Sequence, residues 1–375
     1  MLDRKGGLPT ALALFLLPVF VMVFFLTLLS EGLPQNMPVG VVDLDNTSTT
    51  RTLIRKLDAF QNSEITAHFN SVNEARHAIQ KGEIYAFVYF PKGTTDKLLS
   101  SRRPRVSCYY SSTTLAAGAL TFNDMKTILT LGSAAVGQAT LRAKGMTDGQ
   151  IKAFLQPIAI DLHNISNPEL NYSVYLATSF VPACLMVFVM LLTAFTMGME
   201  IKMGTARKLI LNADGSVIKA ILMKLTGQAI VWNLILIFFE LYIFEYLHFP
   251  HPGGMLRVIF FGILLIGAGQ GFGLFMFGLI SDTRMSMSIC SLWAVLSFSM
   301  MGTAFPVMAM DAPLQSVSWL FPMRHYFVSY STCILNDFPI VDVWWHVVAQ
   351  IAFMASPLLV LSRIKKAFLL YEYTE

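Results

Sequence analysis

The chain has 375 residues, of which 55% are hydrophobic and only 13% are charged, and its formal net charge is +4. Soluble domains carry about 25% charged residues, so this chain has too little polar surface to enclose a globule of its length. Its apolar residues stand in uninterrupted blocks, which excludes an ordinary soluble protein and predicts an integral membrane protein.

Six apolar blocks are long enough to cross a bilayer, which takes about 20 residues. They are Leu8–Ser30, Ser173–Met199, Leu225–Leu247, Val258–Ile280, Met285–Met310 and Val343–Ser362. The first block is longer than the core of a secretory signal and has no clear small-x-small cleavage site, so we interpret it as a retained anchor. Proline lies in the fifth and sixth blocks, and membrane helices tolerate it where neighbours satisfy the freed backbone groups.

The second feature is a small α/β segment between the first and second blocks. Short β-like runs at Val39–Val42, Ala86–Phe90 and Val106–Tyr110 alternate with helical stretches such as Val72–Lys81 and Leu115–Lys144. Strands that alternate with helices in this way favour a small α/β domain. The predicted fold class is therefore a polytopic α-helical membrane protein with six transmembrane helices. An α/β extracytoplasmic domain is inserted between helices 1 and 2, and the predicted boundaries are 1–30, 31–172 and 173–375.

The distribution of Lys and Arg predicts the orientation. The short outer loops keep only Arg257 and Arg324 if the N-terminus lies in the cytoplasm. The cytoplasmic side then receives Arg4, Lys5, Lys202, Arg207, Lys208, Lys219, Arg284, Arg363, Lys365 and Lys366. This asymmetry follows the positive-inside rule, so both termini are expected in the cytoplasm and residues 31–172 outside. It also accounts for the net positive charge, and no nucleic-acid partner is expected.

The stretch Asp43-x-Asp45 follows a predicted strand and is typical of the nucleophile loop of haloacid-dehalogenase-type phosphatases. That chemistry also needs a downstream Lys and a second acidic cluster that holds Mg²⁺. No Asp-Asp pair or Gly-Asp-x-x-x-Asp follows in the chain. We therefore interpret Asp43, Asp45 and Asn46 as turn and cap residues between a strand and a helix.

Several stretches together resemble type-2 ABC exporter permeases. "VGVVDLDNTSTTRTLIRKLDAF" with "SVNEARHAIQKGEIYAFVYFPKGTTDKLL" is similar to their extracytoplasmic half. "MEIKMGTARKLILNADGSVIKAILMKL" resembles the segment between their second and third spans, and "GTAFPVMAMDAPLQSVSWLFPMRHYF" resembles the Pro-rich outer turn after the fifth. The likeness covers essentially the whole chain in order. Such permeases usually carry a longer amphipathic helix before the first span, whereas only Met1–Gly7 precede it here.

The resemblance implies the permease subunit of an ATP-driven exporter of the bacterial inner membrane. It would move a hydrophobic small molecule, a drug or a lipid-like substrate out of the cytoplasm or the inner leaflet. The chain has no Gly-x-x-x-x-Gly-Lys-Ser/Thr loop, so no enzyme activity or cofactor is expected. The expected partners are a separate ABC-type ATPase, a second permease subunit of the same or another kind, and a periplasmic adaptor. The alternative is a membrane-anchored sensor or assembly scaffold whose outer domain binds a ligand without transport.

The stretch from Glu200 to Lys219 is the longest predicted cytoplasmic loop. The resemblance implies that it holds a short coupling helix that enters a cleft of the ATPase. The candidate coupling residues are Glu200, Gly204, Thr205, Arg207, Lys208, Leu209 and Leu211. Charge alone favours a solvated basic loop, and the resemblance favours the coupling helix.

Polar and glycine residues within the predicted spans are further candidates. Polar side chains inside a membrane are costly, and the candidates are Gln228, Asn233, Glu240 and Gln270. Asn233 and Gln270 lie deep enough to bond between helices, whereas Glu240 lies near an outer interface that its carboxylate could reach. The pairs Gly267-x-x-x-Gly271 and Gly269-x-x-x-Gly273 allow two helices to approach closely. They predict either packing within one subunit or a dimer seam.

Overall fold

The computed structural model describes residues 12–100, 102–156, 167 and 171–370. The chain forms two compact units, which we describe separately. One unit comprises Met1–Gly32 and Asn164–Glu375, and the other comprises Leu33–His163.

The unit Leu33–His163 contains a four-stranded sheet in the order β2-β1-β3-β4. β1 runs parallel to β2 and to β3, whereas β4 runs antiparallel to β3. The strands are β1 (Met37–Asp43), β2 (Ser63–His68), β3 (Ala86–Phe90) and β4 (Ser107–Tyr110). The helices are α3 (Ser48–Asp58), α4 (Val72–Lys81), α5 (Thr94–Leu99), α6 (Leu115–Ala143) and α7 (Asp148–Leu155).

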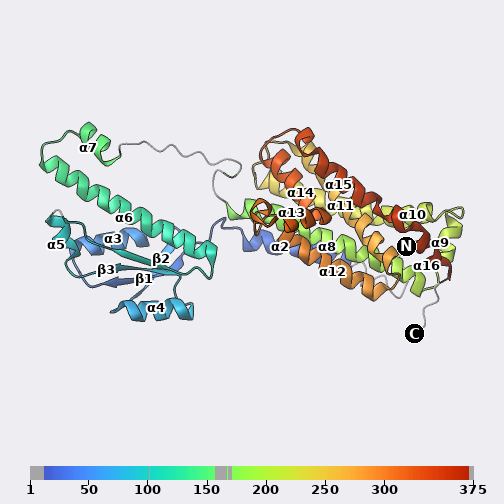
Figure 1. The fold of residues 1–375 in the computed structure, drawn as a ribbon, viewed down its shortest axis with the longest axis horizontal. Coiled ribbons are helices and arrows are strands. Elements are labelled where there is room, and N and C mark those ends of the chain that lie inside the picture. The colour runs from blue at the N-terminus through green and yellow to red at the C-terminus, as the bar shows by residue number, and fades with distance from the viewer. Residues whose placement is uncertain (1–11, 101, 157–166, 168–170, 371–375) are drawn as a thin grey trace. The chain divides into compact units, whose positions relative to one another are not determined.

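Helices cover both faces of this sheet (Figure 1). Alternate residues of β1 point to opposite faces, as the period of a strand requires. Val39 and Val41 pack with α3 and α6, whereas Val42 packs with α4. Each face therefore has its own apolar core, and α6 lies over the face that also carries α3.

The loop after β1 is a hydrogen-bonded turn. The Asp43 carboxylate accepts from the amides of Asp45 and Asn46 at 3.0 and 2.9 Å and from the Thr50 hydroxyl at 2.8 Å. The Asp45 carboxylate accepts from the amides of Thr94 and Thr95, each at 3.0 Å. Both side chains thus join the strand end to the starts of α3 and α5, which is the turn-and-cap role that the sequence favoured.

The other unit is helical. Its long helices are α2 (Leu17–Leu28), α8 (Tyr172–Lys202), α10 (Val217–Leu241), α11 (Met255–Leu279) and α12 (Thr283–Met300). Its shorter helices are α9 (Ala206–Asn212), α13 (Ala312–Val317), α14 (Pro322–Tyr330), α15 (Trp344–Ala355) and α16 (Leu361–Leu370). In the described residues, four helical stretches are long and apolar enough to cross a membrane, namely Tyr172–Lys202, Val217–Tyr246, Met255–Leu279 and Ile340–Leu370.

The other two predicted spans are not among these four stretches. Part of Leu8–Ser30 lies outside the described residues, and the described part forms an apolar helix over Leu14–Leu28. The helix predicted over Met285–Met310 ends at Met300, so its predicted C-terminal end is wrong by ten residues, 300 against 310. Gly302 turns the chain with a φ of +105°, and Pro306 follows without an amide hydrogen to continue a helix.

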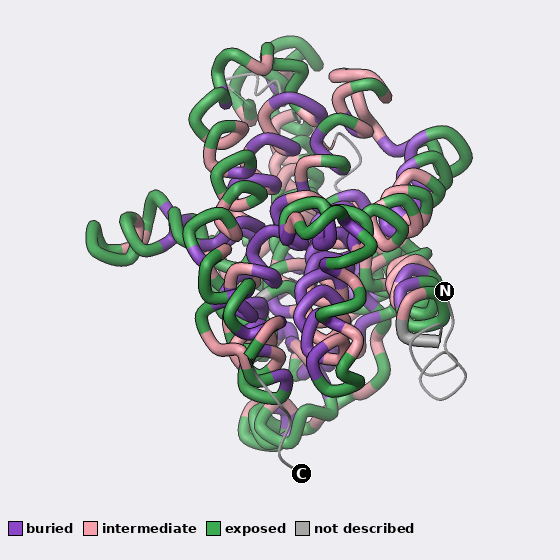
Figure 2. The backbone as a smooth tube through the Cα atoms, turned by 90° about the vertical axis from the view of Figure 1, so that its right-hand side faces the viewer, coloured by how far each residue is buried: buried purple, intermediate pink, exposed green. Residues whose placement is uncertain are grey.

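The helical unit is organised around α8 and α11. In each of these helices, 67% of the most apolar stretch is buried, against 28% in α10 and 17% in the helices that end the chain. Figure 2 shows buried turns inside this unit and exposed turns around it. Because the exposed side chains of α10 include Leu222, Ile230, Leu234 and Phe238, this outer surface of the unit suits a lipid environment.

Candidate functional site

The short helix α9 forms the reversal between α8 and α10. Gly204 leaves α8 with a φ of +67°, and Asp214 and Gly215 lead into α10 with φ values of +55° and +77°. Glycine adopts this backbone region without strain, and Asp tolerates it better than most residues. The Gly204 and Gly215 positions therefore explain why a seven-residue helix can stand between two long helices.

Glu200, near the end of α8, connects the two ends of this reversal through its carboxylate. Its carboxylate accepts a hydrogen bond from the Thr205 hydroxyl at 2.6 Å and forms an ion pair with Lys224 of α10. The Glu200 side chain is 11% exposed and that of Lys224 is 35% exposed. Breaking an ion pair with so little solvent around it costs more folding free energy than breaking a surface pair. It ties the end of α8 to the beginning of α10.

Helix α9 buries one face and exposes the other. Ala206 and Ile210 are one turn apart and are buried, so they fix the helix to the rest of the unit. Leu209 is half-buried and packs against the same core. Lys208 is exposed, and Leu211 is 75% exposed. The outer face therefore presents a positive charge beside an apolar side chain.

Arg207 is engaged by the chain itself. Its Nε and Nη2 donate to the backbone oxygen of Leu369 at 3.1 and 2.8 Å. Leu369 lies in the last turn of α16, where carbonyl groups have no partner within the helix. α9 and α16 consequently lie side by side (Figure 1). Of the two basic residues proposed for α9, Lys208 is the one whose charge points away from the unit.

The four candidate glycines of α11 face two different helices within the chain. A Cβ at Gly269 would lie 3.1 Å from Val189 of α8, and one at Gly273 would lie 2.6 Å from a backbone atom of α8. A Cβ at Gly267 would lie 2.9 Å from Met354 of α15, and one at Gly271 would lie 2.6 Å from the Cα of the same residue. Both pairs thus permit close packing within one subunit.

The polar residues of the spans differ in their partners. The Gln228 amide donates to the Thr196 hydroxyl of α8 at 2.7 Å, and the Gln270 amide donates to the Leu225 carbonyl of α10 at 3.3 Å. Both therefore link neighbouring helices, as expected for Gln270. Asn233 instead donates to the Ala229 carbonyl of its own helix at 2.8 Å, so the predicted bond between helices is wrong for this residue.

Glu240 is buried rather than directed to an interface. Its side chain is 2% exposed, and neither carboxylate oxygen has a hydrogen-bond partner within the described residues. A Cβ at Gly262 of α11 would lie 3.0 Å from Glu240 Oε1. The absence of a Gly262 side chain therefore leaves room for this carboxyl group between α10 and α11.

Two apolar grooves flank α10. One, of about 580 Å³, lies between α2 and α10 and is lined by residues such as Met22 and Phe238. The other, of about 570 Å³, lies between α10, α11 and the helices that end the chain, and Asn233 and Gln270 contribute its polar groups. Both volumes fall within the range of small-molecule sites.

Sequence reasoning missed three of the groups that build α9. Lys224 stands directly before the third apolar block, and nothing in its sequence position indicates Glu200 as a partner. Ile210 gave a signal, because it stands one turn after Ala206. The Leu369 carbonyl gave none, since nothing in a backbone group's own sequence marks which side chain will reach it.

The long apolar helices define a multi-pass membrane protein. A family model described as ABC-2 family transporter protein matches residues 10–362, which is nearly the whole chain. No curated protein matches it. The chain belongs to the ABC-2 family and is a permease component of an ABC transporter. This family implies association with an ABC ATPase subunit.

Proposed function

We propose that this permease exports a hydrophobic small molecule, a drug or a lipid-like substrate from the cytoplasm or the inner leaflet. A separate ATPase supplies the energy, because the chain has no phosphate-binding loop. The observation that carries the proposal is α9, a short helix held between α8 and α10 with Lys208 and Leu211 exposed. Movement of such a helix is passed directly to two long apolar helices.

The geometry at the base of α9 supports this role. A coupling element must be stiff, or motion at its surface is lost before it reaches the membrane helices. The Glu200–Lys224 ion pair and the Thr205 hydrogen bond supply this stiffness, and the buried Ala206 and Ile210 anchor the helix itself. Arg207 adds a contact to α16, so motion of α9 also reaches the end of the chain.

We place the protein in the bacterial inner membrane with six spanning helices. These are the four long apolar stretches together with α2 and α12. Both termini and α9 then lie in the cytoplasm, and the unit Leu33–His163 lies outside. The basic residues support this orientation, because Lys208 and Lys219 flank the same reversal and α16 carries Lys365 and Lys366 beside it.

We further propose that two permease subunits, alike or different, assemble on two ATPase subunits, and that the outer unit contacts a periplasmic adaptor. Because the four candidate glycines of α11 contact α8 and α15 within the chain, we expect the dimer seam on another helix. The apolar grooves beside α10 suit a substrate that arrives from the bilayer.

Transport in inverted membrane vesicles tests the proposal. The permease is expressed with an ABC ATPase from the same genome, and ATP-dependent uptake of the hydrophobic dye Hoechst 33342 is followed by fluorescence. We expect the ATPase to co-purify with the permease, and uptake to require both subunits and ATP. If no ATPase co-purifies and no ATP-dependent uptake is measured, the sensor or scaffold alternative is the better description.

A further inference from the structure

The unit Leu33–His163 contains a large groove to which the proposed function assigns no role. It has a volume of about 1160 Å³ and lies between α3, α5, α6 and α7. Its walls include Leu53, Leu98, Leu131 and Phe154, one from each helix. Leu131 is 57% exposed and Phe154 is 68% exposed. Large apolar side chains that face an open groove commonly mark a ligand site.

The same groove carries positive charge. Lys56 of α3 and Arg102 and Arg103 of the segment after α5 line it, and all three are exposed. Within the described part of the chain, none of these side chains has an ion-pair or hydrogen-bond partner. By contrast, Arg142 at the end of α6 is paired with Asp148 at 2.8 Å. The groove cations are therefore available to an anion that enters with a ligand.

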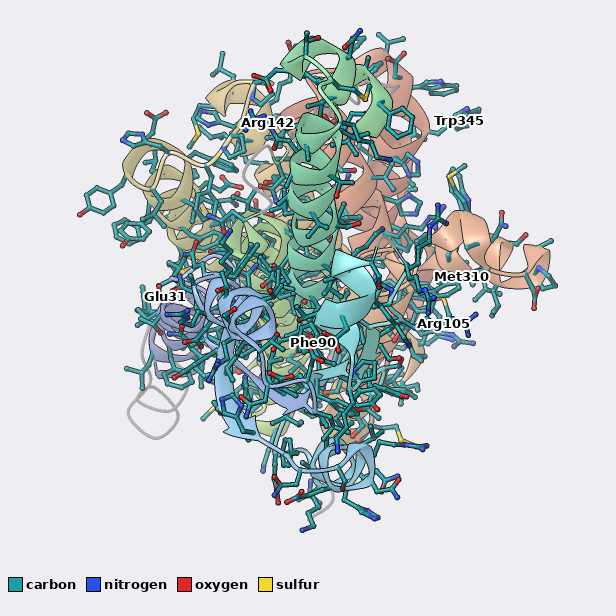
Figure 3. The ribbon with its side chains drawn as sticks, turned by 90° about the vertical axis from the view of Figure 1, so that its left-hand side faces the viewer. Glu31, Phe90, Arg105, Arg142, Met310 and Trp345 are labelled. Carbon is teal, nitrogen blue, oxygen red and sulfur yellow. The ribbon has the colours of Figure 1, made fainter. Side chains whose placement is uncertain are left out.

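The segment that bears these arginines is fixed at both ends. Phe90 ends β3 in the buried core and also lines the groove, and Val106 leads into β4. Figure 3 labels the buried Phe90 and the exposed Arg105, which flank the segment in sequence. The Arg102 amide donates to the Lys97 carbonyl of α5 at 2.8 Å. The arginines are thus held beside the apolar wall rather than on a long free loop.

We propose that this groove binds a free, single-chain anionic amphiphile, with its chain on the apolar wall and its phosphate or carboxylate head on Arg102 and Arg103. Guanidinium groups match both head groups by charge and by paired N–H donors. An apolar wall without the cations fits a neutral ligand, and the cations without the wall fit a free anion. Both features together select an amphiphile. The proposal goes beyond export and holds whether or not the outer unit contacts an adaptor.

Hydrogen-exchange mass spectrometry on the full chain in phosphatidylcholine nanodiscs tests this site. The probe is decyl phosphate, and the readout is its concentration at half-maximal protection in peptides of α6 and α7. We expect saturable protection with decyl phosphate and decanoate. Decanol, which has the same chain without charge, and inorganic phosphate, which has the charge without the chain, should protect little at equal concentrations.

Variants locate the ligand. Arg102→Ala with Arg103→Ala is expected to raise the half-maximal concentration roughly tenfold, because two exposed ionic contacts to the head group are lost. The matched control, Arg76→Ala with Lys81→Ala, removes the same charge from α4 on the other face of the sheet and should leave it unchanged.

Several outcomes overturn the proposal. Equal protection by decanol shows that the groove binds any apolar chain, and equal protection by inorganic phosphate shows a simple anion site. An unchanged midpoint in the arginine variant removes the cations from the site. Saturated protection in phosphatidylglycerol nanodiscs without added probe assigns the groove to membrane headgroups instead of a free amphiphile.

Discussion

The ion pair between Glu200 and Lys224 provides a quantitative test of how α9 is held. Glu200→Gln removes the charge but keeps an oxygen that can accept from Thr205, and Lys224→Met keeps the aliphatic stem. Exposed pairs contribute about 0–1 kcal/mol, and breaking a buried pair costs about 3–5 kcal/mol. The side chains are 11% and 35% exposed, so we expect each single change to cost about 1–3 kcal/mol of unfolding free energy.

The assay is equilibrium unfolding of the purified permease in mixed detergent micelles, arranged as a double-mutant cycle. We expect a coupling energy of about 1–2 kcal/mol between Glu200 and Lys224. The control cycle uses Asp214→Asn and Lys219→Met, an ion pair at 3.2 Å whose side chains are 84% and 62% exposed. It should give less than about 0.5 kcal/mol. Equal coupling energies in the two cycles would refute the idea that burial stiffens the base of α9.

Three further predictions address packing, acid stability and orientation. Gly273→Ala should cost about 1–3 kcal/mol in the same unfolding assay, because its Cβ would meet the backbone of α8, whereas Gly227→Ala, with open space around it, should be neutral or slightly stabilising. Burial alone raises the pKa of Asp45, but hydrogen bonds from Thr95 and Thr47 hold that pKa below its usual value. The ionised Asp45 therefore stabilises the folded protein above about pH 3.9, and this contribution is lost as the pH falls through the folded pKa. Asp45→Asn should therefore lower the unfolding free energy at neutral pH by about 0.5–2 kcal/mol. The variant should also lose less unfolding free energy than the wild type when the pH is lowered. Hydrogen exchange in β1 at several pH values measures both effects, and an unchanged acid profile would contradict this prediction. With the four native cysteines replaced, Gln61→Cys should react with an impermeant thiol reagent in intact cells and Asn212→Cys should not, and the reverse pattern would invert the proposed topology.

Much of the α/β unit could be predicted because local pattern and final structure agree there. The apolar runs at Ala86–Phe90 and before Asp43 are strands, and the stretch at Val72–Lys81 is a helix with Ser71 as its N-cap. β2 (Ser63–His68) was missed. Only alternate residues of this edge strand are shielded, so its sequence carries too few apolar residues to stand out.

Contacts between distant segments could not be predicted. Arg207 and Leu369 are 162 residues apart, and the family resemblance had assigned the arginine to a partner protein instead. Glu240 was expected near an interface because it stands at the end of an apolar block, yet α11 covers it at Gly262. In both cases the outcome depends on which helix packs against the residue, and hydropathy does not encode that.

The affinity of the permease for its ATPase tests most directly whether energy enters through α9. The dissociation constant is measured by biolayer interferometry with the permease in nanodiscs, for the wild type, for Lys208→Glu with Leu211→Asp, and for Lys365→Glu with Lys366→Glu in α16. We expect the α9 change to weaken binding by about 10–100-fold, as reversal of a docked charge does, and the α16 change to weaken it less than about threefold. Wild-type affinity in the α9 variant, with the protein folded and inserted, would contradict coupling through this helix.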